Sequence, residues 1–308
     1  MQDQGRFGFR DSGVPVCGAM DRQALRLANL LAGNGAHAAC IEITLGGFAA
    51  QFLCDARFAL TGAKTLAQCG GSPLPFWEVH FARKGEIIQT GPPVSGIRTY
   101  LAVQGGIDVP ELMGSRSTFL RGNLGGFEGR SLRREDLLFV GEPGKTGPSF
   151  PVFKLPPELV PIYSANARLR VLPGPQIERL TPEGLQTLFS SEYVVSNRSD
   201  RMGAMLCGPA VELSRGGDII SEGAFPGAVQ IPGNGQPVLL GSDCQTTGGY
   251  VKCAAVIEVD LPVAAQLGPG NTVGFVEVSL DEARSAYLKN EYLLARLYEN
   301  SAKAGGAT

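Results

Sequence analysis

The chain has 308 residues, with 27 basic and 29 acidic side chains and a formal net charge of −2. This length is enough for two domains that each bury a core, and the balanced charge argues against nucleic acid or an anionic membrane as a partner. Because no apolar run is long enough to span a membrane and residues 1–10 do not resemble a signal peptide, we expect a cytoplasmic protein.

The histidines and cysteines argue against several kinds of catalytic site. The two histidines are His37 and His80, and the sequence has no G-x-S-x-G turn near either, so a Ser-His-Asp triad is not expected. The seven cysteines include no C-x-x-C pair, which argues against zinc and against a disulfide framework. We therefore expect no metal, and any catalysis must use carboxylates, arginines, amides and backbone donors.

The first half of the chain is predicted to be mainly β with one helix. The chain's 42 glycines and 21 prolines, together with short β-branched runs, are typical of strands joined by tight turns. The helix is expected at residues 22–32, with Asp21 as its N-cap and Gly33 at its C-terminal end. Strands are expected at 40–45, 58–61, 78–82, 86–89 and 98–103.

A linker is predicted at residues 141–167, because six prolines gather there and proline suits neither a helix interior nor a central strand. Inside it, Gly144-Lys145-Thr146 resembles the end of a phosphate-binding loop. Phe139 stands where that motif needs a glycine, so we reject this interpretation. The linker separates a first domain at 1–140 from a second domain at 168–278.

The second half is also predicted to be β-rich. Alternating charged and apolar residues predict a strand at 168–172. A short helix is expected to begin at Pro182, with Thr181 as its cap. Further strands are expected at 193–195, 210–213, 228–231, 238–241, 252–259 and 272–278.

The chain is predicted to end in a helix at 279–303, followed by a disordered tail at 304–308. Ser279 and Glu282 form a capping box at the start of this helix. The helix carries an apolar stripe, which predicts that it docks on a barrel, and its members are Leu280, Ala283, Tyr287, Leu294 and Leu297.

Residues 221–250 concentrate amides, hydroxyls and glycines, which is the composition of a backbone that approaches a small polar ligand. For the amides, the alternative is hydrogen bonding at strand ends, and Asp243 has the alternative of fixing the following Gln-Thr-Thr turn. Cys244 lies in the same stretch, with no histidine or lysine fixed beside it by sequence. The candidate substrate-binding residues here are Gln230, Gln236, Asp243, Gln245, Thr246, Thr247 and Tyr250.

Two other polar groups complete the candidate site. Asp200 and Arg201 are the candidate catalytic residues, one as a base or hydrogen-bond acceptor and the other as an anion clamp. The alternative is that they form a pair that orders a turn. Ser115 and Arg116 are candidate substrate-binding residues in the first half, with the alternative that Arg116 ties down the linker.

These motifs resemble one known family. The stretch at 221–250, together with Gln2–Gly8, Gly13–Asp21, Gly105–Pro110 and Ser199–Gly203, is similar to the family of the C subunit of bacterial 5-oxoprolinase. That family is also described as allophanate hydrolase subunit 2 or biotin-dependent carboxyltransferase-like. The resemblance implies two cyclophilin-like β-barrel domains in tandem plus the C-terminal helix. It also implies that the chain works with the A and B subunits to cleave 5-oxoproline to L-glutamate with ATP hydrolysis, ATP being bound at the level of the complex.

The resemblance leaves two further functions open. Close relatives form the carboxyltransferase part of urea carboxylase, which would require biotin, and others are described as antagonists of a sporulation kinase inhibitor, which would make the chain a regulatory binding protein. The chain also departs from the family pattern at Cys17 and Val251, where serine and proline are common. It begins at Met1, where relatives usually carry further residues that supply a first strand, so we expect the first barrel to lack that strand.

Overall fold

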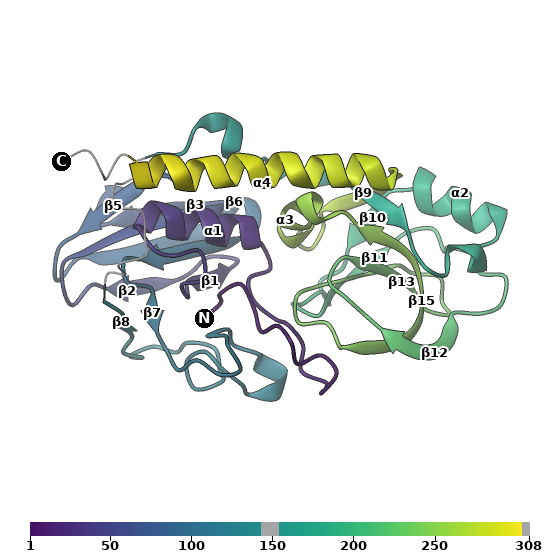
Figure 1. The fold of residues 1–308 in the computed structure, drawn as a ribbon, viewed down its shortest axis with the longest axis horizontal. Coiled ribbons are helices and arrows are strands. Elements are labelled where there is room, and N and C mark those ends of the chain that lie inside the picture. Colours follow the sequence, from purple (N-terminus) through teal and green to yellow (C-terminus); the bar gives the residue numbers. More distant parts are fainter. Residues whose placement is uncertain (143–153, 304–308) are drawn as a thin grey trace. The chain divides into compact units, whose positions relative to one another are not determined.

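The computed structural model describes residues 1–142 and 154–303. The chain divides into two compact units (Figure 1): unit 1 comprises Met1–Arg6, Cys17–Ile162 and Tyr292–Thr308, and unit 2 comprises Phe7–Val16 and Tyr163–Glu291. The described residues form four α-helices and many strands, which confirms the prediction of a mainly β fold with a few helices. The rejected phosphate-loop motif, part of the predicted linker and the predicted tail lie outside the described residues.

Unit 1 is built on a six-stranded sheet with the order β1-β6-β3-β4, in which β2 also pairs with β6 and β5 with β3. A two-stranded ribbon of β7 and β8 accompanies it. The strands are β1 (Ile41–Thr44), β2 (Ala49–Gln51), β3 (Ala56–Cys69), β4 (Ser72–Pro73), β5 (Val79–Ala82), β6 (Ile87–Val103), β7 (Ile107–Asp108) and β8 (Phe139–Val140).

The prediction of separate strands at 86–89 and 98–103 is wrong, because both belong to the single long strand β6. Gly91, Pro92 and Pro93 between them read as a turn in the sequence. The pairing of β6 with β3 shifts register three times between Gly62 and Ala67 of β3. Proline is tolerated in a strand where the hydrogen-bond ladder is irregular, so the chain continues instead of turning back.

Helix α1 (Arg22–Ala32) has the predicted bounds and caps. The Asp21 carboxylate accepts a hydrogen bond from the Ala24 N–H at 2.8 Å, and Gly33 ends the helix in the left-handed conformation. The helix packs on β3 and β6, and leucines such as Leu25 are fully buried. Burying one such side chain contributes about 1.5–3 kcal/mol. The Tyr298 hydroxyl donates to the Arg26 carbonyl at 3.0 Å, so the end of the C-terminal helix also contacts α1.

Unit 2 contains a closed barrel of seven strands, in the order β15-β13-β14-β11-β10-β16-β9, with β9 pairing back to β15. Strand β12 adds to β15 outside this ring. The pair of β9 and β16 is parallel. The strands are β9 (Asn166–Pro173), β10 (Tyr193–Val195), β11 (Gly203–Cys207), β12 (Asp218–Gly223), β13 (Ala228–Ile231), β14 (Val238–Leu240), β15 (Thr247–Val256) and β16 (Thr272–Glu277).

The predicted strand at 210–213 is wrong, and the strand in this region is β11 instead. Within 210–213, Val211 donates its N–H to the Gly235 carbonyl, and Leu213 forms an isolated bridge with Leu180. The alternating apolar residues therefore bury side chains without joining a ladder. Strand β15 also begins earlier than predicted, so Thr247 and Tyr250 lie in a strand and not in a turn.

The remaining helices agree in part with those predicted from the sequence. Helix α2 (Pro182–Ser190) begins as predicted, with the Thr181 hydroxyl accepting from the Gly184 N–H at 3.0 Å. Helix α3 (Leu261–Ala265) was not predicted. Short 3₁₀ helices lie at η1 (Leu120–Gly122), η2 (Pro157–Leu159), η3 (Ile177–Arg179) and η4 (Glu258–Asp260).

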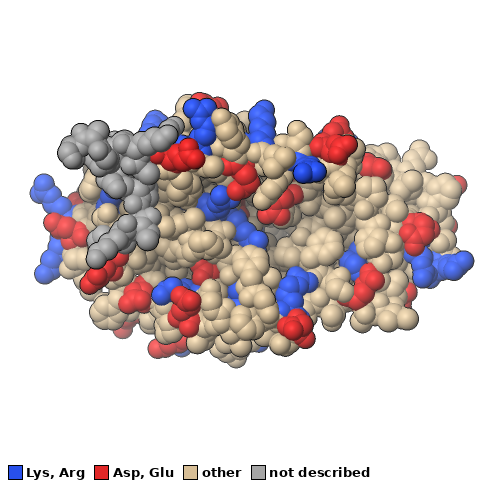
Figure 2. Space-filling view, in the orientation of Figure 1, with Lys and Arg blue, Asp and Glu red and all other residues tan. Residues whose placement is uncertain are grey.

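Helix α4 (Leu280–Lys303) has the predicted capping box, in which the Glu282 N–H donates to the Ser279 hydroxyl at 3.2 Å. The predicted docking stripe is wrong at two positions, because Leu280 and Tyr287 are 69% and 43% exposed, whereas Leu294 is buried. None of the helices in the described ranges has the length and apolar composition of a membrane span. Acidic and basic side chains are intermixed on the face shown in Figure 2.

Candidate functional site

The candidate site lies on the outer face of strands β13 and β15 in unit 2. Val229 and Ile231 of β13 point into the barrel core, so the alternation of the strand turns Gln230 to the opposite face. Gln230 is nevertheless only 2% exposed. It stands directly opposite Lys252 in the pairing of β13 with β15. Directly opposite residues share a face and have Cβ atoms about 4.5–5.5 Å apart, so these two side chains are neighbours.

The side-chain amides of Gln230 and Gln245 both face Gly248. A Cβ atom at Gly248 would lie 3.1 Å from Nε2 of Gln230 and 3.2 Å from Nε2 of Gln245. Within the described part of the chain, Nε2 of Gln230 is buried and has no hydrogen-bond partner. An unpaired buried donor costs about 1–3 kcal/mol. The glycine therefore lets two amide donors pack close to the β15 backbone, and the donor of Gln230 lacks an acceptor within the described residues.

Lys252 adds a buried positive charge to this face. Its side chain is 2% exposed, and Nζ lies 2.5 Å from Oε1 of Glu222, whose side chain is 44% exposed. Glu222 is the register partner of Gly248 in the pairing of β12 with β15, so the ammonium extends along β15 toward Gly248. The same carboxylate oxygen accepts from Nε2 of Gln176 at 2.6 Å. The bonds from Lys252 and Gln176 hold the pKa of Glu222 below its usual value.

The sequence analysis missed Lys252 and Glu222. A signal for Lys252 was present, because a lysine stands between Val251 and Cys253, which fill the barrel core. A charged residue in such a strand is rarely buried without a specific partner. Glu222 gave no comparable signal, because it lies in a strand that was not predicted. Together with the two amides, Lys252 makes this face rich in donors, which suits a ligand that offers oxygen acceptors.

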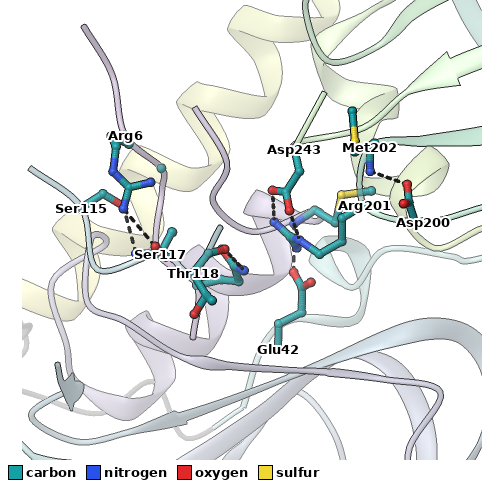
Figure 3. A network of polar contacts seen from close by, with 12 residues as sticks. Arg6, Glu42, Ser115, Ser117, Thr118, Asp200, Arg201, Met202 and Asp243 are labelled. Atoms are coloured by element: carbon teal, nitrogen blue, oxygen red, sulfur yellow. Dashed lines mark hydrogen bonds and ion pairs between the residues drawn. The ribbon is translucent and has the colours of Figure 1, made fainter. Parts of the chain in front are cut away.

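Arg201 and Asp243 form a bidentate ion pair (Figure 3). Nε and Nη2 of Arg201 donate to the two carboxylate oxygens of Asp243 at 2.9 and 2.8 Å. The two side chains are 15% and 6% exposed, and the Asp243 N–H donates to the Arg201 carbonyl at 3.0 Å. The Asp243 carboxylate thus binds Arg201 and does not cap the Gln-Thr-Thr turn. The pair fixes the start of the loop that leads to Gln245.

The other candidate catalytic residue, Asp200, contacts the neighbouring backbone. Asp200 is exposed, and its Oδ1 accepts from the Met202 N–H at 2.8 Å, which closes a local turn (Figure 3). Its role as a base and the alternative of a pair with Arg201 both stay predictions.

The other amide and hydroxyl candidates are used in different ways. Both ends of the Gln236 amide bond to the backbone of Gly208 at 3.0 Å, which explains this residue without a ligand. The Thr246 carbonyl accepts from the Ala224 N–H at 2.9 Å. Thr247 and Tyr250 are exposed on β15. Their roles in substrate binding stay predictions.

Ser115 and Arg116 belong to unit 1 and surround a buried carboxylate. The Ser115 hydroxyl and the Arg116 N–H donate to the two oxygens of Asp3 at 2.7 and 2.6 Å. The Arg116 side chain forms an exposed ion pair with Glu111 at 2.8 Å. Nearby, Nη2 of Arg6 donates to the Ser117 carbonyl at 3.0 Å (Figure 3). These contacts anchor the N-terminal segment within unit 1, and Arg116 pairs with Glu111.

Cys244 is suited to packing and not to nucleophilic chemistry. Its side chain is buried against Ala224, Ala228 and Leu240. Burial raises the pKa of its thiol to about 11, so the thiolate is scarce at neutral pH.

Unit 2 is thus a closed β-barrel that brings amide and ammonium donors together beside one glycine. The chain belongs to the family described as carboxyltransferase domain, subdomain A and B, whose model matches residues 12–277. This membership confirms the resemblance noted in the sequence.

Three comparisons place the chain within this family. It is 40% identical to the C subunit of 5-oxoprolinase from Escherichia coli over 287 residues, which cover 93% of this chain and 90% of that protein. It is 36% identical to the C subunit of 5-oxoprolinase from Haemophilus influenzae, covering 96% and 94% of the two chains. The crystal structure of the K. lactis urea amidolyase is similar with a TM-score of 0.91 and 32% identity, covering 96% of this chain but 19% of that much longer one.

Proposed function

We propose that this chain is the C subunit of an ATP-dependent 5-oxoprolinase. In this proposal it works in the cytoplasm with the A and B subunits to cleave 5-oxo-L-proline to L-glutamate, and ATP is bound by the assembled complex. The observation that carries the proposal is the match to two proteins named as the C subunit of 5-oxoprolinase, which extends over at least 90% of both chains in each case. The urea amidolyase contains a similar domain as a small part of a much longer chain.

The geometry of the candidate site supports this proposal. 5-Oxoproline offers a lactam carbonyl and a carboxylate, and both accept hydrogen bonds. The donors that face Gly248 come from Gln230 and Gln245, with Lys252 beside them. Donors fixed in a buried setting stabilise negative charge on an oxygen without reorganising. Arg201, held by Asp243, acts as a positioning residue for the loop before Gln245, and Asp200 remains the candidate base.

A carboxyltransferase is the second candidate function. The name of the matching family and the similarity to the urea amidolyase structure favour it. Biotin would then be the carrier of the carboxyl group, and its ureido oxygen is an acceptor that fits the amide donors of Gln230 and Gln245. The third candidate function is regulatory. In this case the chain would bind a kinase inhibitor similar to the B subunit through a surface and would catalyse no reaction.

Reconstitution with the two partner subunits tests the proposal. We expect ADP release that depends on 5-oxo-L-proline and that disappears when this chain is omitted. Activity that survives the omission would contradict the proposal. Turnover of urea that avidin blocks, once bicarbonate, a biotin carboxylase and its biotinylated carrier are added, would favour the carboxyltransferase. Tight binding of the partner that is similar to the B subunit, with neither reaction detected, would favour the regulatory protein.

A further inference from the structure

We propose that Lys252, Gln230 and Gln245 bind the carboxylate of the substrate and thereby select a cyclic amide that carries an acid group. This inference rests on the proposed function and adds the part of the substrate that this face recognises. It makes Lys252 a specificity-determining residue. The lactam carbonyl, where the bond breaks, is then left to other groups.

The first argument is the charge of Lys252. Its side chain is 2% exposed, yet its carboxylate partner Glu222 is 44% exposed and comes from strand β12, outside the barrel ring. A buried ammonium requires close compensation of its charge. Gln176 holds the Glu222 carboxylate in place, so Lys252 keeps a counter-ion when no ligand is present. An ammonium has three N–H donors, so a second carboxylate beside it would accept the donors that Glu222 leaves over.

The second argument is the count of donors and acceptors. The amide nitrogens of Gln230 and Gln245 lie 3.1 and 3.2 Å from the position that a Cβ atom at Gly248 would take, so the two donors are neighbours. The donor of Gln230 has no acceptor within the described ranges. A carboxylate has two oxygens with about four acceptor positions, enough for both amides and the ammonium. A neutral carbonyl oxygen has fewer acceptor positions and carries no negative charge that would attract the ammonium of Lys252.

The third argument is the close approach of the amides to Gly248. This glycine lies in β15 and has no positive φ, so its backbone does not require glycine. Its lack of a side chain instead lets the two amide nitrogens pack close to the β15 backbone. Gly223, in the adjacent strand β12, is a matched control, because a Cβ there would meet nothing within 4 Å. Alanine at Gly248 would displace the two amides, whereas alanine at Gly223 would displace nothing.

The test uses the reconstituted complex with 5-oxo-L-proline and with its neutral analogue 5-oxo-L-prolinamide. For Lys252→Met, Gln245→Leu and Gly248→Ala we expect the KM of the acid to rise about ten- to hundredfold, which is the loss of a hydrogen bond to a charged group. The KM of the amide should change little, so the ratio of the KM of the amide to the KM of the acid should fall. Gly223→Ala should behave as the wild type.

Thermal unfolding of each variant separates a lost contact from a lost fold. Gln245 is half-buried on a loop, so its variant is expected to fold even if Lys252→Met does not. If folded variants keep the wild-type KM and the wild-type preference for the acid, this inference is overturned while the proposed function stands. If they lower kcat equally for acid and amide at constant KM, Lys252 has a structural role and the inference is also overturned. If the wild-type complex shows no 5-oxoproline-dependent ADP release, the proposed function fails and this inference fails with it.

Discussion

Replacing Asp243 with asparagine tests the ion pair that fixes the start of the candidate loop. The pair is bidentate, with distances of 2.9 and 2.8 Å, and its two side chains are 15% and 6% exposed. Removing one partner of such a buried pair costs about 3–5 kcal/mol, because the Arg201 guanidinium loses two charge-assisted hydrogen bonds. Since 1 kcal/mol shifts the Tm of a domain this size by about 2–4 °C, we expect Asp243→Asn to lower Tm by at least about 6 °C.

Urea unfolding and calorimetry measure this effect. The double variant Arg201→Met/Asp243→Leu should recover most of the loss, because apolar residues can replace a buried ion pair at little net cost. Glu111→Gln is the control, since its pair with Arg116 is exposed and such pairs contribute about 0–1 kcal/mol. A loss below about 0.5 kcal/mol for Asp243→Asn would refute the reasoning, because the pair would then behave like a surface salt bridge.

Three further predictions follow from local contacts. Because burial raises the pKa of Cys244 to about 11, its alkylation by iodoacetamide at pH 8 should be far slower than that of the exposed Cys54, and equal rates by mass spectrometry would contradict its burial. The Arg130 guanidinium holds the pKa of Asp136 at about 2, below its value in the unfolded chain. The ion pair therefore stabilises the fold above about pH 4, and this stabilisation is lost as the pH falls toward 2. The Tm difference between wild type and Asp136→Asn should shrink over that interval, and a constant difference would argue against the pairing. Asp21→Ala removes the N-cap of α1 and should cost about 1–2 kcal/mol in urea unfolding, and an unchanged midpoint would show that the cap adds nothing.

Local signals in the sequence were sufficient for several elements. The bounds of α1 follow from Asp21 and Gly33, whose capping roles depend on residues within one helical turn. The start of α2 follows in the same way from Thr181. Strand β13 was also predicted with its observed bounds, because its four apolar and amide residues lie between glycine and proline.

Elements that depend on distant partners were predicted less well. Pro93 lies inside β6 because the register shifts of β3, far away in the sequence, create a place for it. Strand β12, with exposed polar residues, is defined by its pairing with β15 and carries little apolar pattern of its own.

The candidate site shows the same division. The sequence identified the amides of Gln230 and Gln245 as residues of a ligand-binding stretch. It did not identify their convergence on Gly248, because this depends on the pairing of β13 and β15 and on the loop between them. The partner of Arg201 was also unforeseen, since Asp243 is 42 positions away in the chain.

The most direct test of the central claim is the rate of ADP release by the reconstituted complex, measured in parallel with 5-oxo-L-proline and with urea, the urea assay also containing bicarbonate, a biotin carboxylase and its biotinylated carrier. We predict a rate that rises with 5-oxo-L-proline, needs this chain and does not respond to urea or to avidin. A rate that responds to urea and is blocked by avidin, with no response to 5-oxo-L-proline, would contradict the assignment to 5-oxoprolinase.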